Sequence, residues 1–324
     1  MPLPTLDVLE AAARVVHAVL PPTPQYRWPL LSARAGCGVW VKHENHTPVG
    51  AFKVRGGLVY LDALARQGAL PPGIVSATRG NHGQSLGFAA ARHGVPVTIV
   101  VPHGNAREKN AAMQALGCTL VEHGEDFQAA TEHAAALAAE RGLHRVPSFD
   151  PLLVAGVGTY ALELLRAVPS LEVLYVPVGL GSGVCGVLAA KAALGHRVEV
   201  VGVVSAHAPT YAESFAARAP VSAPVTTVLA DGMACRTPVP EALEVMLAGV
   251  SRIVSVSDDE VAEAMRAIFR DTHNVAEGAG AAGFAALWQE RAQLRGREAG
   301  FVLCGANVDS AVFAEVLAGR TPRV

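Results

Sequence analysis

A lysine in the run GAFKVRGG, residues 50 to 57, is the first residue whose surroundings suggest chemistry. Lys53 follows a predicted strand and lies next to Phe52 and Val54. Burial among apolar neighbours disfavours the charged amine and lowers its pKa, so the neutral amine can attack a carbonyl group. An isolated lysine is far more often a surface residue whose aliphatic stem lies along the protein. A chemical role for Lys53 therefore depends on features elsewhere in the sequence.

A glycine-rich segment, PVGLGSGVCG at residues 177 to 186, follows a strongly apolar predicted strand and leads into a predicted helix. Its glycines allow successive N–H groups to converge on one point at the positive end of that helix. The segment therefore predicts a phosphate cradle. A tight turn alone would need fewer glycines. The predicted cradle consists of Gly179, Leu180, Gly181, Ser182 and Gly183.

The same segment also has a dinucleotide-binding interpretation. GSGVCG, residues 181 to 186, matches G-x-G-x-x-G, and Glu199 follows at about the distance of a ribose-binding acid. However, Glu199 begins its predicted strand, whereas the ribose contact needs an acid at a strand end. A nicotinamide-dependent oxidoreductase stays an alternative, although it leaves Lys53 without a role. No G-K-[ST] follows the glycines, which excludes a nucleoside triphosphate P-loop.

A second loop, SATRGNHGQS at residues 76 to 85, also lies between a predicted strand and a predicted helix. Its amides and hydroxyl groups favour an anionic or polar ligand over a simple turn. In α/β sheets, ligands bind at the carboxyl ends of strands, where Lys53 and both loops are expected. An amine, a phosphate cradle and an anion loop together are what pyridoxal phosphate needs, because it is held as an imine of lysine.

The chain resembles the serine/threonine dehydratases, which are pyridoxal phosphate enzymes of fold type II, the tryptophan synthase β-like fold. The resemblance extends from about residue 22 to residue 309. It rests on six segments in the family's order and spacing: KHENHTPVGAFKVRGG, SATRGNHGQS, PVGLGSGVCG, LADGMACRTP, VAEGAGAAGFAAL and LCGANVD.

The resemblance implies a role for each candidate residue that binds the cofactor. Lys53 would hold the cofactor as an imine and later take the substrate's Cα proton. Phe52 would pack against the pyridine ring, and Asn81 would bond the 3-hydroxyl group. Residues 179 to 183 would bind the phosphate. Cys304 would face the pyridine nitrogen; its thiol cannot protonate the ring, which favours β-elimination over transamination.

The substrate would bind at the second loop. By resemblance, Thr78 and the amides from Gly80 to His82 would hold its carboxylate. Arg79 departs from the Ser or Ala of many relatives, and arginine cannot act as a base. We therefore expect no racemisation. Arg79 would bond a second polar or anionic group of the substrate or close the carboxylate site; alternatively, it would point to solvent or pair with an acid of the protein. Glu277 is expected near the cofactor by resemblance alone.

No metal site is expected. Some relatives hold a divalent cation through a glutamate, and Ser205 stands at that position here. The pair His43 and His46 has metal-like spacing, but residues three positions apart on a strand face opposite sides, so these rings are expected to point apart.

The elements that position these residues alternate between apolar strands and alanine-rich helices, which predicts mostly parallel sheets covered by helices. Strands are expected at 38–44, 73–78, 95–101, 171–178, 199–205 and 301–306, and helices at 84–94 and 106–117. The resemblance implies two α/β domains. The large one would comprise residues 1–46 and 153–324, and the small inserted one residues 47–152.

Composition narrows the class of protein. The net charge is -2 with no basic run, so a nucleic-acid partner is not expected. No apolar run reaches the roughly 18 to 20 residues that span a membrane, and the N-terminus does not resemble a signal peptide. The five cysteines are scattered, which fits reduced thiols in a cytoplasmic protein. The resemblance implies a homodimer.

The predicted function is β-elimination from a 3-hydroxy amino acid, L-threonine or L-serine, giving a 2-oxo acid and ammonia. A larger or more polar substrate read by Arg79, such as 3-phenylserine or 3-hydroxyaspartate, stays open, as does a carrier that binds pyridoxal phosphate without turnover. The chain ends shortly after LCGANVD, so isoleucine feedback through a C-terminal regulatory domain is not expected.

Overall fold

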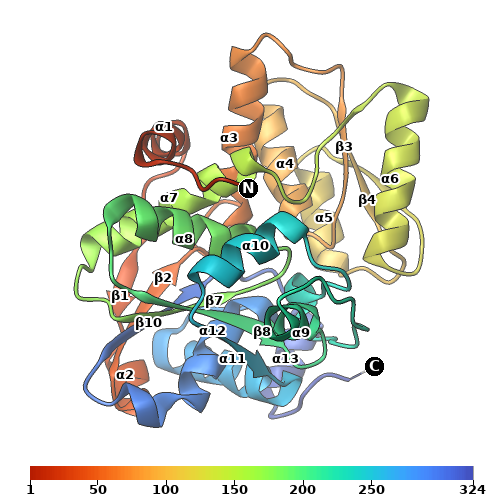
Figure 1. The fold of residues 1–324 in the computed structure, drawn as a ribbon. Helices are drawn as coiled ribbons and strands as arrows, with labels where there is room; N and C mark the ends of the chain where they lie inside the picture. Colours follow the sequence, from red (N-terminus) through yellow and green to blue (C-terminus); the bar gives the residue numbers. More distant parts are fainter. Residues whose placement is uncertain (324) are drawn as a thin grey trace.

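The strands form two separate sheets in the computed structural model, which describes residues 1 to 323 (Figure 1). The larger sheet has six strands in the order β1-β2-β10-β7-β8-β9 and is parallel except for β1, which pairs antiparallel with β2. These strands are β1 (Gln25–Arg27), β2 (Gly38–His43), β10 (Glu298–Leu303), β7 (Val173–Pro177), β8 (Glu199–Ser205) and β9 (Arg252–Val256).

The smaller sheet is parallel throughout and lies in the upper part of Figure 1. Its order is β5-β4-β3-β6, and its strands are β5 (Thr119–Glu122), β4 (Val97–Val101), β3 (Ile74–Ala77) and β6 (His144–Arg145). Two mostly parallel sheets flanked by helices confirm the predicted fold class. The limits of the two domains, at residues 47 and 152, stay a prediction.

Helices cover both sheets. On the smaller sheet, α6 (Phe127–Arg141) packs on β3 and β4, and α4 (Asn81–Ala91) and α5 (Arg107–Ala115) lie on the other side. On the larger sheet, α12 (Gly278–Gln289) packs on β7 and β10, and α8 (Ser182–Leu194) packs on β7. The remaining helices are α1 (Leu6–His17), α2 (Pro29–Ala35), α3 (Lys53–Arg66), α7 (Pro151–Ala167), α9 (Thr210–Ala217), α10 (Pro240–Gly249), α11 (Asp258–Thr272) and α13 (Ser310–Leu317), with short 3₁₀ turns η1 (Asp231–Met233) and η2 (Arg291–Leu294).

The strands predicted from the sequence are those with continuous apolar runs. All four residues of β3 and the first four of β7 are buried, as expected for strands covered on both faces. Strands β1, β5, β6 and β9 were not predicted from the sequence. These strands are short or partly exposed, and polar residues interrupt them, so their apolar signal is weak.

Two local expectations were wrong. Helix α4 begins at Asn81, three residues before the predicted start, so the Asn-His pair lies in its first turn. The rings of His43 and His46 do not point apart; they stack with centroids 4.9 Å apart. His46 follows the end of β2 in a turn, so the alternation of a strand no longer applies to it. Within residues 1 to 323, no cluster of three potential metal ligands is present.

A buried ionic network fixes α3, the helix that begins with Lys53. The guanidinium of Arg55 is fully buried and donates to Glu44 at 2.7 and 3.0 Å and to Glu163 at 2.6 and 3.0 Å. Lys42 donates to Glu163 at 2.6 Å. Although burial opposes it, Arg55 and Lys42 lower the pKa of Glu163 to about 2. The network joins β2, α3 and α7.

Replacing Arg55 with methionine is expected to lower the free energy of unfolding by about 3–5 kcal/mol, because it leaves the buried Glu44 carboxylate uncompensated. Urea unfolding followed by circular dichroism measures the loss. In the unchanged protein, the stabilisation from Glu163 is present above its ordinary pKa and is lost as the pH falls toward about 2. A matched change at exposed Arg66, which pairs with Asp62 on the surface, is expected to cost less than about 1 kcal/mol. Equal losses in the two variants would contradict the account.

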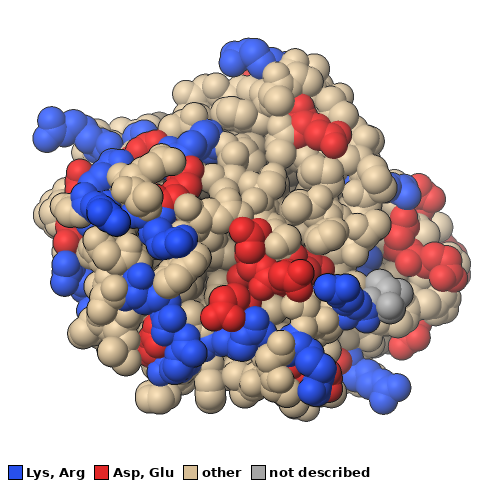
Figure 2. All heavy atoms as spheres, turned by 90° about the horizontal axis from the view of Figure 1, so that it is seen from below, with Lys and Arg blue, Asp and Glu red and all other residues tan. Residues whose placement is uncertain are grey.

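A search of the described residues finds no helix that is long and apolar enough to cross a membrane. On the face seen in Figure 2, basic and acidic side chains are intermingled, with an acidic group near the centre and basic groups around it.

Candidate active site

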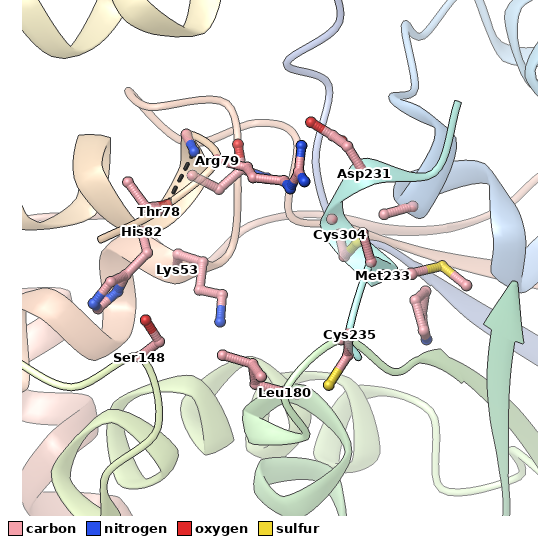
Figure 3. A pocket seen from close by; sticks show the side chains of 18 of the residues that line it. Lys53, Thr78, Arg79, His82, Ser148, Leu180, Asp231, Met233, Cys235 and Cys304 are labelled. Atoms are coloured by element: carbon pink, nitrogen blue, oxygen red, sulfur yellow. Dashed lines mark hydrogen bonds between the residues drawn. The ribbon is translucent and has the colours of Figure 1, made fainter. Parts of the chain in front are cut away.

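The main pocket is built from the first turns of four helices (Figure 3). The beginnings of α3, α4, α8 and α12 all line it, and none of these helices has a side chain capping its first turn. Among the described residues, α6, α7 and α11 are capped by Asp126, Asp150 and Ser257, and the other helices lack a side-chain cap, so it is the meeting of four open helix starts at one place that marks the pocket. Free N–H groups and the positive ends of the helix dipoles therefore converge on the pocket, which suits a ligand with several negative groups.

The structure brings all the predicted site residues together around this one pocket, which holds about 870 Å³ of empty space including open solvent. They are Phe52, Lys53, Thr78, Arg79, Gly80, Asn81, His82, Gly179, Leu180, Gly181, Ser182, Gly183 and Cys304. Their individual roles stay predictions. Their meeting follows from the topology, because the loops after parallel strands share one edge of a sheet.

Lys53 has the environment expected of a nucleophilic amine. It begins α3, and its Nζ donates to Ser182 Oγ at 3.1 Å and lies 5.2 Å from the ring centroid of Phe52. Burial lowers its pKa to about 8. The hydroxyl of Ser85 donates to the Lys53 carbonyl at 2.6 Å, which anchors the backbone. The neutral form of this amine is therefore far more populated at neutral pH than that of an ordinary lysine, whose pKa is about 10.4.

The glycine-rich loop connects β7 to α8. Gly181 is the N-cap of α8 with φ 101°, a conformation that favours glycine. A Cβ on Gly179 would lie 2.5 Å from the carbonyl oxygen of Gly232, so this position is closed to larger residues. The loop can therefore approach η1 closely while the first-turn amides of α8 stay open to the pocket.

A cluster of charges that the sequence analysis did not predict crosses the pocket. Lys109, from α5, lies 2.7 Å from Asp231 of η1 and 3.4 Å from Glu277, the residue before α12. Glu277 accepts a hydrogen bond from Asn81 Nδ2 at 2.7 Å. Asn307 Nδ2 donates to Asn81 Oδ1 at 2.8 Å. The amide of Asn81 is therefore oriented from both of its ends.

The local sequence around Lys109 gives little indication that it belongs to this cluster. Lys109 lies in the helix predicted at residues 106–117, where neighbouring polar residues do not distinguish it from a surface lysine. It is only 5% exposed, and its stem crosses Gly80, where a Cβ would lie 2.6 Å from Lys109 Cδ. Only Glu277 had been placed near the cofactor, by resemblance.

Two uncharged groups complete the pocket. Burial, with a smaller effect of Lys53, lowers the pKa of His82 to about 3, so its ring is neutral at physiological pH. Burial raises the pKa of the Cys304 thiol well above its ordinary value, so it too is neutral. Neither group can supply a positive charge to a ligand.

Pyridoxal phosphate fits this arrangement. It needs a reactive amine, for which the buried Lys53 is suited, and a phosphate site, for which the open amides of α8 are suited. Two buried polar atoms with no hydrogen-bond partner among residues 1 to 323 also belong to residues that line the pocket, namely Arg79 Nε and His82 Nε2. Such atoms are rare in proteins unless a ligand or water completes them.

Comparisons with known proteins agree with this assignment. A family model described as "Pyridoxal-phosphate dependent enzyme" matches residues 17–305. The chain is 35% identical to an L-threonine ammonia-lyase of Geobacter sulfurreducens over 86% of this chain and 69% of that protein. It is 32% identical to an L-threonine ammonia-lyase of Thermotoga maritima over 94% of this chain and 76% of that protein.

A solved structure gives the same result for the fold. The processed form of threonine deaminase isoform 2 from Solanum lycopersicum superposes with a TM-score of 0.87 and 27% identity, covering 98% of this chain and 95% of the other. The reactive lysine, the open helix ends and these similarities agree, and the chain belongs to the family of pyridoxal-phosphate dependent enzymes.

Proposed function

We propose that this protein is a pyridoxal phosphate-dependent ammonia-lyase that converts L-threonine or L-serine to a 2-oxo acid and ammonia. The observation that carries the proposal is Lys53, a buried amine with a pKa of about 8 that faces the uncapped start of α8. The names of the relatives from Geobacter and Thermotoga support the choice of substrate.

Two anion sites of the pocket would hold the reactants. The first-turn amides of α8, with Gly179 to Gly183, would hold the cofactor's phosphate. The start of α4 would hold the substrate carboxylate, where Thr78 Oγ1 already accepts a hydrogen bond from the Gly80 N–H at 2.9 Å. The two sites lie at the starts of different helices, so a ligand that uses both is fixed at both ends.

Lys53 would accept the Cα proton of the substrate. When bound, pyridoxal phosphate supplies a carbonyl that links to the substrate amine and a ring that withdraws electrons. The Lys53 amine, whose pKa burial lowers to about 8, would be the group placed to accept the Cα proton when it is in its neutral form. The same atom can then return a proton to the hydroxyl group, which leaves as water. Ser182 Oγ, 3.1 Å from Nζ, would hold the amine in place.

Two features of the pocket limit other reactions. The first is Cys304. Its thiol is neutral and a weak donor, so it would not protonate a ring nitrogen of the cofactor that faced it. A weaker electron sink favours loss of the β-hydroxyl over transamination. Arg79 cannot act as a base, so the pocket offers no second proton carrier at that position for racemisation.

The direct test is to incubate the purified protein and pyridoxal phosphate with L-threonine and to measure 2-oxobutanoate and ammonia. We expect equal amounts of both, and pyruvate with ammonia from L-serine. No added nicotinamide cofactor should be needed. Absence of oxo acid from both substrates, in protein that has taken up the cofactor, would contradict the proposal and favour a non-catalytic carrier. Turnover that depends on nicotinamide would favour the oxidoreductase.

We further propose a cytoplasmic homodimer. All five cysteines are free and buried, which suits a reducing compartment. The dimer is proposed from the resemblance to the dehydratases. Sedimentation equilibrium of the holoenzyme would test it, and a monomer at micromolar concentration would exclude it.

A further inference from the structure

Arg79 is a cation in the pocket without an anionic partner. Within residues 1 to 323, the cations that line the pocket are Lys53, Arg79 and Lys109, and only Lys109 pairs with carboxylates. Buried cations elsewhere, Arg55 and Lys42, are also paired. Lys53 is accounted for by the cofactor. Arg79, which is half-buried, is then the pocket cation that has no anionic partner among the described residues.

The guanidinium of Arg79 is prepared for such a ligand. Its Nε is buried and has no hydrogen-bond partner among the described residues. A buried donor without a partner is unfavourable, and binding of a ligand that accepts from it removes this cost. The Nε and Nη groups form the planar fork that bonds a carboxylate through two parallel hydrogen bonds. A carboxylate is therefore the group that best satisfies the hydrogen-bond donors of the Arg79 guanidinium.

This carboxylate is a different one from the anions already placed. The phosphate site lies at the loop of Leu180, on the far side of Lys53 from Arg79 (Figure 3). Thr78 and His82, beside which the substrate's α-carboxylate would bind, lie on one side of the pocket. The side chain of Arg79 extends the other way, toward Asp231.

Asp231, the acid toward which Arg79 extends, does not form an ion pair with it. Asp231 is bound by Lys109 at 2.7 Å, and no ion pair joins Asp231 to Arg79 in the described residues. Glu277 is likewise engaged by Asn81 and by Lys109. Both acids are therefore already paired with Lys109, and within residues 1 to 323 no ion pair joins either of them to Arg79.

We infer that Arg79 forms a second anion subsite and that the substrates it selects are 3-hydroxy amino acids with a second carboxylate, such as 3-hydroxyaspartate. This inference rests on the proposed function and names its substrate class. The reaction balances without any oxidant or reductant. The Cα–H bond breaks with the proton going to Lys53, and the Cβ–O bond breaks with loss of water. Water then replaces the nitrogen, giving oxaloacetate and ammonia.

The test compares kcat/KM for 3-hydroxyaspartate and L-threonine in the holoenzyme, in Arg79→Gln and in Arg107→Gln. Arg107 is an exposed arginine outside the pocket and serves as the matched control. We expect the unchanged enzyme to prefer 3-hydroxyaspartate by at least about tenfold. The preference should fall by about 10- to 100-fold in Arg79→Gln, the range for hydrogen bonds to a charged group. It should stay the same in Arg107→Gln.

A binding measurement separates this subsite from the chemistry. L-aspartate and L-2-aminobutyrate lack the 3-hydroxyl group, so elimination of water does not consume them. Calorimetry of the holoenzyme should give a dissociation constant at least about tenfold lower for aspartate, and Arg79→Gln should abolish the difference. Tight aspartate binding without oxo acid from any hydroxy amino acid would keep the subsite and exclude the proposed function.

Three results would overturn the inference. An equal loss for both substrates in Arg79→Gln would place the α-carboxylate on Arg79. A loss of cofactor affinity would place the phosphate there. An unchanged preference, together with normal turnover of threonine, would leave Arg79 without a role in substrate selection while the proposed function stands.

Discussion

Lys53→Ala is expected to lower kcat for L-threonine by at least about a thousandfold, within the range for removal of a general base. The variant should also lose the covalent attachment of the cofactor, so it should stay colourless after dialysis against buffer. The fold should persist, because alanine is the best helix former and position 53 begins α3. Lys53 makes no ion pair among the described residues whose loss would destabilise the protein.

The matched control is Lys191→Ala. Lys191 lies in the last turn of α8, away from the pocket, and should keep full activity and colour. A Lys53→Ala variant that retained more than about a tenth of the native kcat would mean that another group takes the Cα proton, well short of the effect expected for a general base.

The same lysine predicts a pH dependence. Only its neutral amine can attack the cofactor's aldehyde, and burial places its pKa at about 8. The rate at which the apoprotein takes up pyridoxal phosphate should therefore rise with pH, reach half its maximum near pH 8 and level off above. A rate that continued to rise to the pH range of an ordinary lysine, about 10.4, would show that Lys53 is not shifted.

Lys109→Met is expected to lower the free energy of unfolding by about 3–5 kcal/mol at neutral pH, because the change leaves a buried carboxylate without its cation. Glu277 is 2% exposed, and Lys109 is the cation nearest to it. The change also removes an ion pair between α5, on the smaller sheet, and η1, near the larger one. Activity should fall as well, since Glu277 orients Asn81.

The pH dependence of this loss has a defined sign. Burial raises the pKa of Glu277, and Lys109 opposes that rise. Without Lys109, the pKa of Glu277 in the folded protein should rise further, so the protein becomes more stable as the pH falls and the carboxyl group is protonated. The stability difference between the native protein and Lys109→Met should therefore be largest near neutral pH and shrink toward acid.

A second substitution separates charge from packing. In the Lys109→Met background, Glu277→Gln removes the unpaired charge and should recover part of the lost stability, a coupling that a double-mutant cycle measures. Urea unfolding at several pH values provides these free energies. A Lys109→Met variant within about 1 kcal/mol of the native protein at neutral pH would show that the cluster adds no more than a surface ion pair does.

The parts of the site that could be predicted lie in the loops directly after strong strands. Lys53, the loop around Asn81 and the glycine-rich loop each follow an apolar run, and the topology of a parallel sheet then brings them together. These signals are local, because a strand, a glycine and a polar side chain lie within ten residues of one another. The resemblance to the dehydratases added the identity of the cofactor and the roles to be tested.

The parts that could not be predicted depend on contacts between distant residues. Lys109 and Asp231 are 122 positions apart, and nothing in either local segment indicates that they meet. Arg55 likewise finds Glu163 on another helix, 108 positions away. The stacking of His43 on His46 depends on the turn that ends β2, which the strand pattern did not indicate. Charge partners across a fold are set by tertiary packing, and periodicity carries no information about them.

The central claim is that Lys53 is the residue that holds pyridoxal phosphate, and borohydride reduction of the holoenzyme tests it most directly. Reduction fixes the cofactor to whichever lysine bears it, and mass spectrometry of the digested protein identifies the peptide. The account predicts a single modified peptide containing Lys53, with Lys42, Lys109 and Lys191 unmodified. A cofactor fixed to one of those three lysines, or a reduced protein with no modified peptide, would contradict it.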